Sequence, residues 1–95
     1  MQPGYRSLAG IDVHKKLLAV VVRWEQEGQS YTDQRMFGTT RREIEHLAAW
    51  LRQHQVQEAV MESTAQYWRP VWYRLEGHFG LHLSHPLATR ARRGR

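Results

Sequence analysis

The chain has 95 residues, of which 41% are apolar, and it carries a formal net charge of +5. This length allows one small domain, and the apolar content is too high for a disordered chain. The sequence has no cysteine, which excludes a disulfide framework, a thiolate zinc site and a cysteine nucleophile, and favours a cytoplasmic location.

Three strand patterns open the chain after a short lead-in. They span Leu8–Val13, Leu17–Trp24 and Ser30–Phe37, with breaks at Lys15–Lys16 and Glu25–Gln29. Links this short predict an antiparallel meander. The unbroken apolar run of the second strand predicts burial on both faces, and it is too short to cross a membrane.

A helix is predicted next, followed by a fourth strand. Thr40 and Glu43 have the spacing of a capping box, and the apolar residues after them recur on one helical face until His54–Gln55. Val56–Met61 then reads as a short apolar strand that Glu62 follows directly. Because a helix separates this strand from the meander, a parallel crossover is the expected connection.

The second helix has a less regular start. Ser63 or Thr64 is the expected cap, and Pro70 is tolerated only in a first turn, so we expect an irregular entry over residues 64–69. A fifth strand is predicted around Leu81–Leu83, and residues 87–95 are expected to form an exposed basic tail.

The resulting order, β-β-β-α-β-α-β, predicts an α/β fold with a mixed five-stranded sheet. An antiparallel meander followed by crossovers is the pattern of ribonuclease H-like domains. Actin-like and sugar-kinase ATPase halves share it, but the segment after the first strand, Val13–Lys16, lacks the glycines of their phosphate loops.

Two carboxylates are the strongest candidates for chemistry. Asp12 ends an apolar strand and Glu62 follows the fourth strand, so the two face each other if these strands pair. Paired carboxylates repel unless a cation or a shared proton compensates them, and Mg²⁺ or Mn²⁺ bound through oxygen atoms is the obvious remedy. The alternatives are a turn-bonding Asp12 and a Glu62 that favours a helix N-terminus.

Basic and aromatic residues are weaker candidates for nucleic-acid contact. Lys15, Lys16 and Arg69 could meet phosphates, although solvated surface residues explain them more simply. The tail adds Arg90, Arg92, Arg93 and Arg95. His14 could touch a phosphate but fits a hairpin residue better, and Tyr67 and at least one of Trp68 and Trp72 fit the core better than base stacking.

Three segments resemble the insertion-sequence transposases of the IS one-ten group. These are Gly10-Ile11-Asp12-Val13-His14-Lys15, Phe37-Gly38-Thr39-Thr40 and the specific run Met61-Glu62-Ser63-Thr64-Ala65-Gln66-Tyr67-Trp68-Arg69-Pro70-Val71-Trp72. The resemblance implies a RuvC-like domain with four metal-binding acidic residues, of which Asp12 and Glu62 match the first two. It also implies DNA transposition, a separate domain with a serine, and a guide RNA.

The family's last two acidic residues have no match here. No Asp follows Glu62, and the only later acid is Glu76. We therefore expect an amino-terminal, incomplete catalytic domain spanning 1–95 that binds metal weakly and is inactive alone. A bare sheet face would favour self-association or a second chain with the missing half. The alternatives are a non-catalytic nucleic-acid-binding protein and, less favoured, an ATPase half.

Overall fold

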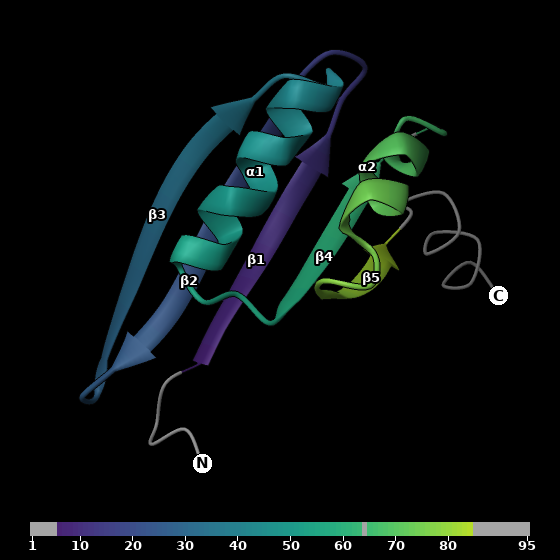
Figure 1. Ribbon diagram of the computed structural model, residues 1–95. Helices are drawn as coiled ribbons and strands as arrows, with labels where there is room; N and C mark the ends of the chain where they lie inside the picture. The colour runs from purple at the N-terminus through teal and green to yellow at the C-terminus, as the bar shows by residue number, and fades with distance from the viewer. Residues whose placement is uncertain (1–5, 64, 85–95) are drawn as a thin grey trace, which may run out of the picture.

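Five strands and two helices follow one another in the order that the sequence predicts (Figure 1). The computed structural model describes residues 6–63 and 65–84, so the tail with its four arginines lies outside the described residues. The elements are β1 (Arg6–Val13), β2 (Leu18–Gln26), β3 (Gln29–Phe37), α1 (Arg41–Gln53), β4 (Glu58–Ser63), α2 (Trp68–Leu75) and β5 (Gly80–Ser84).

The strands form one mixed sheet in the order β3-β2-β1-β4-β5. The first three strands make the predicted antiparallel meander, and β4 and β5 run parallel to β1. Both helices lie against the same face of this sheet (Figure 1). The α/β class and the mixed five-stranded sheet are therefore confirmed. Neither described helix is long and apolar enough to cross a membrane.

The turn between β2 and β3 is tighter than the predicted break at Glu25–Gln29. Only Glu27 and Gly28 lie outside the strands, with φ angles of 52° and 79°. Two successive positive φ angles are typical of a type I′ turn, whose twist matches that of the flanking strands. The two strands therefore extend further into the predicted turn than composition indicates.

One face of the sheet is buried under the helices. Alternate residues of β1 point to this side, where Ile11 and Val13 are each 2% exposed. The core that they join is contributed by every layer and includes Leu18, Val20, Val22, Phe37, Ile44, Leu47, Leu51, Met61, Val71 and Leu75. Burial of this apolar surface is the main favourable contribution to folding.

No described helix covers the other face, which we call the open face. Its apolar residues remain partly accessible: Leu8 is 52% exposed, Val21 40%, Met36 59% and Val60 45%. The prediction that the Leu17–Trp24 strand is buried on both faces is therefore wrong for the described part of the chain. The reason is that both helices follow the meander and pack on one side of it.

Helix α1 is capped by a side chain at its start and by backbone hydrogen bonds at its end. The Thr40 hydroxyl accepts a hydrogen bond from the Glu43 N–H at 3.2 Å, as predicted, but the Glu43 carboxylate accepts from Gly38 N–H at 3.0 Å rather than from Thr40. That bond, with a smaller contribution from His46, lowers the pKa of Glu43. At the other end Gln55, with φ of 57°, takes the left-handed position that usually belongs to glycine in a Schellman motif.

Two boundaries differ from the prediction because of local hydrogen bonds. The Val56 N–H donates to the Leu51 carbonyl at 3.0 Å, so Val56 closes the helix and β4 starts two residues later, at Glu58. The Ser63 hydroxyl bonds to Ala65 and does not cap α2, which begins at Trp68 without a side-chain cap. Thr64 lies outside the described residues.

At the start of α2, one aromatic residue that we predicted to lie in the core is exposed. Pro70 falls in the first turn, where no N–H is needed, as predicted. Tyr67 is 41% exposed and is not a core residue. Trp68 and Trp72 are partly buried and pack edge to face with ring centroids 5.7 Å apart.

Candidate functional site

Asp12 and Glu62 are direct register partners on neighbouring parallel strands. Each is the penultimate residue of its strand, β1 or β4, so both stand at the carboxyl ends of the sheet. Their chain neighbours Ile11, Val13 and Met61 are buried under the helices, and alternation therefore turns both carboxylates to the open face. The predicted juxtaposition is thus present, between backbones about 4.8 Å apart.

A shallow hollow of about 420 Å³ surrounds the pair. Small residues form part of its floor, since Gly10 and Ala19 line it beside the carboxylates. A Cβ at Gly10 would meet no atom within 4 Å, so any side chain there would project freely into the hollow. The absence of a side chain at position 10 keeps the space next to Asp12 open.

His14 belongs to the same surface, although the sequence favoured a plain hairpin residue. Its Nε2 lies 3.1 Å from Oδ2 of Asp12, and both side chains are 56% exposed. The two residues are two positions apart at the end of β1, which brings their side chains to one face. That spacing is the signal that could have indicated the contact.

Ser84 is a second neighbour that the sequence did not single out. It is the register partner of Glu62 on β5 and lines the hollow. The Glu62 carboxylate has no hydrogen bond or ion pair with any described residue. One oxygen of Asp12 is therefore held by an imidazole, whereas the Glu62 carboxylate is free to turn toward a ligand.

The two carboxylates are the right type of ligand for a hard divalent cation, but they are too few to hold one. Carboxylate oxygens are preferred ligands of Mg²⁺, which also keeps several waters. Within residues 6–63 and 65–84, however, no group of three or more His, Asp or Glu residues is placed to hold a metal ion. Asp12 and Glu62 are therefore two suitable carboxylate donors without a third described ligand beside them.

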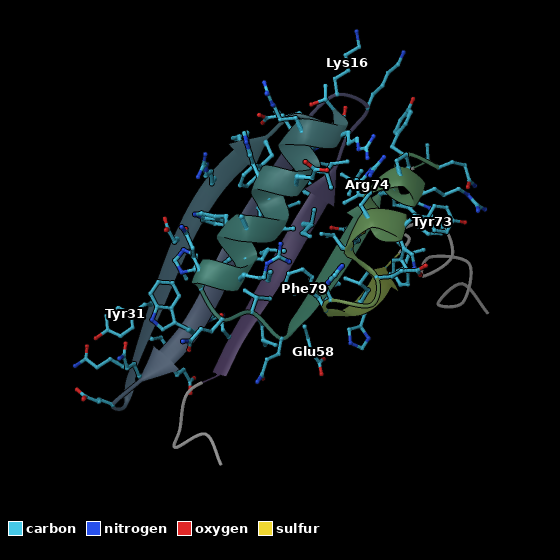
Figure 2. The ribbon with its side chains drawn as sticks, viewed as in Figure 1. Lys16, Tyr31, Glu58, Tyr73, Arg74 and Phe79 are labelled. Atoms are coloured by element: carbon cyan, nitrogen blue, oxygen red, sulfur yellow. The ribbon has the colours of Figure 1, made fainter. Side chains whose placement is uncertain are left out.

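The basic candidates do not gather at one place. Lys15 and Lys16 form the turn after β1, next to the carboxyl ends of β1 and β4, and Lys16 is labelled there in Figure 2. Arg69 lies at the start of α2, where it bonds to Gln66 and stacks its guanidinium 5.0 Å from the Trp68 ring. Two contacts thus fix the plane of Arg69 while leaving it exposed.

Residues 9–95 match a protein family described as transposase, the DEDD type of the IS110 (IS one-ten) group. The match covers nearly the whole chain and includes both Asp12 and Glu62. No curated protein matches the chain.

Solved structures resemble the chain in fold. An exopolyphosphatase from Cytophaga hutchinsonii has a TM-score of 0.58 at 9% identity, over 86% of this chain and 35% of that one. A Ppx/GppA family member from Aquifex aeolicus has a TM-score of 0.54 at 13% identity, over 86% and 36% of the two chains. The chain thus spans about a third of each. At this identity the likeness shows the fold alone.

Proposed function

Because this chain belongs to the IS110-type DEDD transposase family, we propose that its open face is the amino-terminal part of a catalytic site for cutting and joining DNA. The observation that carries the proposal is the register of Asp12 and Glu62 on β1 and β4. In this proposal the domain is ribonuclease H-like, of the RuvC type that the resemblance implies.

Asp12 and Glu62 would hold a divalent cation, Mg²⁺ or Mn²⁺, between the carboxyl ends of the two strands. When bound, such a cation supplies positive charge beside a scissile phosphate. Two neighbouring residues of the chain shape the site around Asp12. His14 orients the Asp12 carboxylate through one oxygen, at 3.1 Å, and the missing side chain at Gly10 leaves room for a phosphate next to it.

These 95 residues match two of the four acidic residues that the resemblance implies. Octahedral Mg²⁺ with two protein carboxylates would bind weakly. We therefore propose that these 95 residues alone neither cut nor join DNA, and that the further acidic residues and the serine lie outside them. Nicking of DNA by the purified chain that needs Mg²⁺ and disappears in Asp12→Ala would overturn this part of the proposal.

Calorimetric titration with Mn²⁺ and Mg²⁺ tests the half-site. We expect weak binding by the wild-type chain that is lost in Asp12→Asn and in Glu62→Gln. The control is Glu58→Gln, which removes a carboxylate from the same strand and the same face but from a position paired with His82 at 3.0 Å. Binding that falls equally in the control, or is unchanged by both site variants, would contradict the proposal.

Two other functions make different predictions. A non-catalytic nucleic-acid-binding protein would keep its affinity and a steep salt dependence in Asp12→Asn, without metal binding. The likeness to Ppx/GppA structures favours a phosphate-handling site of the actin-like kind as the other candidate. Saturable binding of ATP in calorimetry would support that function, although the turn after β1 has no glycine.

A further inference from the structure

The two helices leave a groove between them on the face of the sheet away from Asp12 and Glu62. It measures about 380 Å³, and its polar lining consists of Glu45, Arg52, Tyr73, Arg74 and His78. Neither the acidic pair nor the turn at Lys15–Lys16 contributes to it. The groove is therefore a separate surface that the proposed half-site does not use.

Helical spacing explains why the groove has this lining. Arg52 follows Ile44 and Ala48 by two turns and one turn of α1, so all three share the side that lines the groove. Arg74 comes from the last turn of α2 and lies on the side toward α1 (Figure 2). Gly77, with φ of 88°, then turns the chain so that His78 lines the same groove.

The two arginines are not neutralised by the described part of the chain. Neither Arg52 nor Arg74 makes an ion pair or a side-chain hydrogen bond with a described residue. Glu45, the acidic residue among the described residues that line the groove, is already 3.6 Å from Arg41. Each arginine also lies where a helix C-terminus favours positive charge, but that preference does not bring two of them to one groove.

An exposed aromatic ring accompanies this charge. Tyr73, which is labelled on α2 in Figure 2, is 60% exposed and has no hydrogen-bond partner among the described residues. An accessible aromatic face beside unpaired guanidinium groups is the combination that binds single-stranded nucleic acid, through base stacking and phosphate contacts. A purely inorganic polyanion would make no use of the ring.

We propose that the groove between α1 and α2 binds a single strand of nucleic acid. Arg52 and Arg74 contact successive phosphates, and Tyr73 stacks on an unpaired base. The binding needs no metal, and it goes beyond the proposed function because it occupies the opposite side of the sheet. Such a chain would hold one strand on its helical side while the acidic pair remains open to another.

The test is fluorescence anisotropy of the full 95-residue chain in EDTA, with single-stranded DNA and RNA of the same sequence, each about 12 nucleotides long. For the double variant Arg52→Gln/Arg74→Gln we expect about a tenfold loss of affinity, and a log–log salt slope smaller by roughly 1.4. The corresponding Arg→Lys double variant should regain most of the binding, because it restores the charge. Thermal melting confirms that each variant is folded.

The matched control is Arg23→Gln/Arg42→Gln, which removes the same charge from exposed positions outside the groove. A loss of affinity equal to that of the groove variant would show that only net charge matters, and would overturn the proposal. The groove is assayed in EDTA and the half-site by metal titration, so failure of one proposal is distinguishable from failure of the other.

Tyr73→Leu separates nucleic acid from other polyanions. We expect it to weaken binding of single strands about fivefold or more and to leave duplex DNA nearly unaffected. Unchanged single-strand affinity, together with equal competition by inorganic polyphosphate, would contradict a nucleic-acid site. A difference between the DNA and RNA arms identifies which strand the groove takes, since only RNA offers a 2′-hydroxyl.

Discussion

The two faces of one sheet differ in what their side chains do, although the same strands supply both. On the covered face, Ile11 and Met61 are at most 2% exposed and pack under the helices. On the open face, their chain neighbours Asp12 and Glu62 stand in register around a hollow. Because side chains alternate along a strand, core residues and candidate site residues are chain neighbours. Substitutions one position apart should therefore have different consequences.

A comparison of Met61→Ala with Val60→Ala tests this difference between the two faces. It has the largest expected effect on the free energy of unfolding. Met61 is fully buried, so its truncation should cost about 2–5 kcal/mol, which is a large part of the stability of so small a domain. Val60 is 45% exposed and should cost less than about 1 kcal/mol. Urea unfolding measures both. Equal losses would show that the open face is covered in solution, for example by self-association.

Gln55→Gly tests the conformation at the end of α1, one of the two helices that cover the sheet. Gln55 holds a left-handed conformation at the end of α1, which is unfavourable for a residue with a Cβ and free for glycine. Glycine also raises the conformational entropy of the unfolded chain, which offsets part of this benefit. We therefore expect the free energy of unfolding, measured by thermal melting, to rise by roughly 0.5–1 kcal/mol. Gln57→Gly serves as the control and should destabilise, because Gln57 has no positive φ.

Glu62→Gln should have a small effect of the opposite sign to a core substitution. Like charges on register partners repel, so removing the one without a described partner should stabilise the metal-free chain by a few tenths of a kcal/mol. Melting in EDTA measures the change, and added Mn²⁺ should then raise the melting temperature of the wild type only. A destabilised Glu62→Gln in EDTA would mean that the carboxylate has a structural partner.

Glu43 gives the smallest predicted effect, and it depends on pH. The hydrogen bond from Gly38 lowers the pKa of Glu43 in the folded chain. A carboxyl with a depressed folded pKa stabilises the fold above its unfolded pKa and loses that contribution as pH falls through the folded value. Glu43→Gln should therefore lessen the loss of stability below about pH 4.3. An unchanged acid profile would contradict the role of this bond.

The order of elements and the acidic pair could be predicted because they depend on local patterns and one topological rule. Alternation, the Thr40–Glu43 cap and the apolar stripe of α1 are readable within a few residues. A helix between two strands predicts a parallel crossover, which places Asp12 beside Glu62 if β1 and β4 are neighbours. The structure shows that these two strands pair. The function proposed for the pair, by contrast, rests on the family match, and the metal titration tests it.

The sequence by itself indicated that Asp12 and Glu62 would face each other if the first and fourth strands paired. Only the tertiary structure decided that His14 holds Asp12 and that the Glu43 carboxylate bonds to Gly38. It also decided that Arg52 and Arg74, far apart in the chain, border one groove. The physical reason is that strand pairing follows side-chain periodicity, whereas contacts between a helix and its neighbours depend on how each helix is rotated and placed on the sheet.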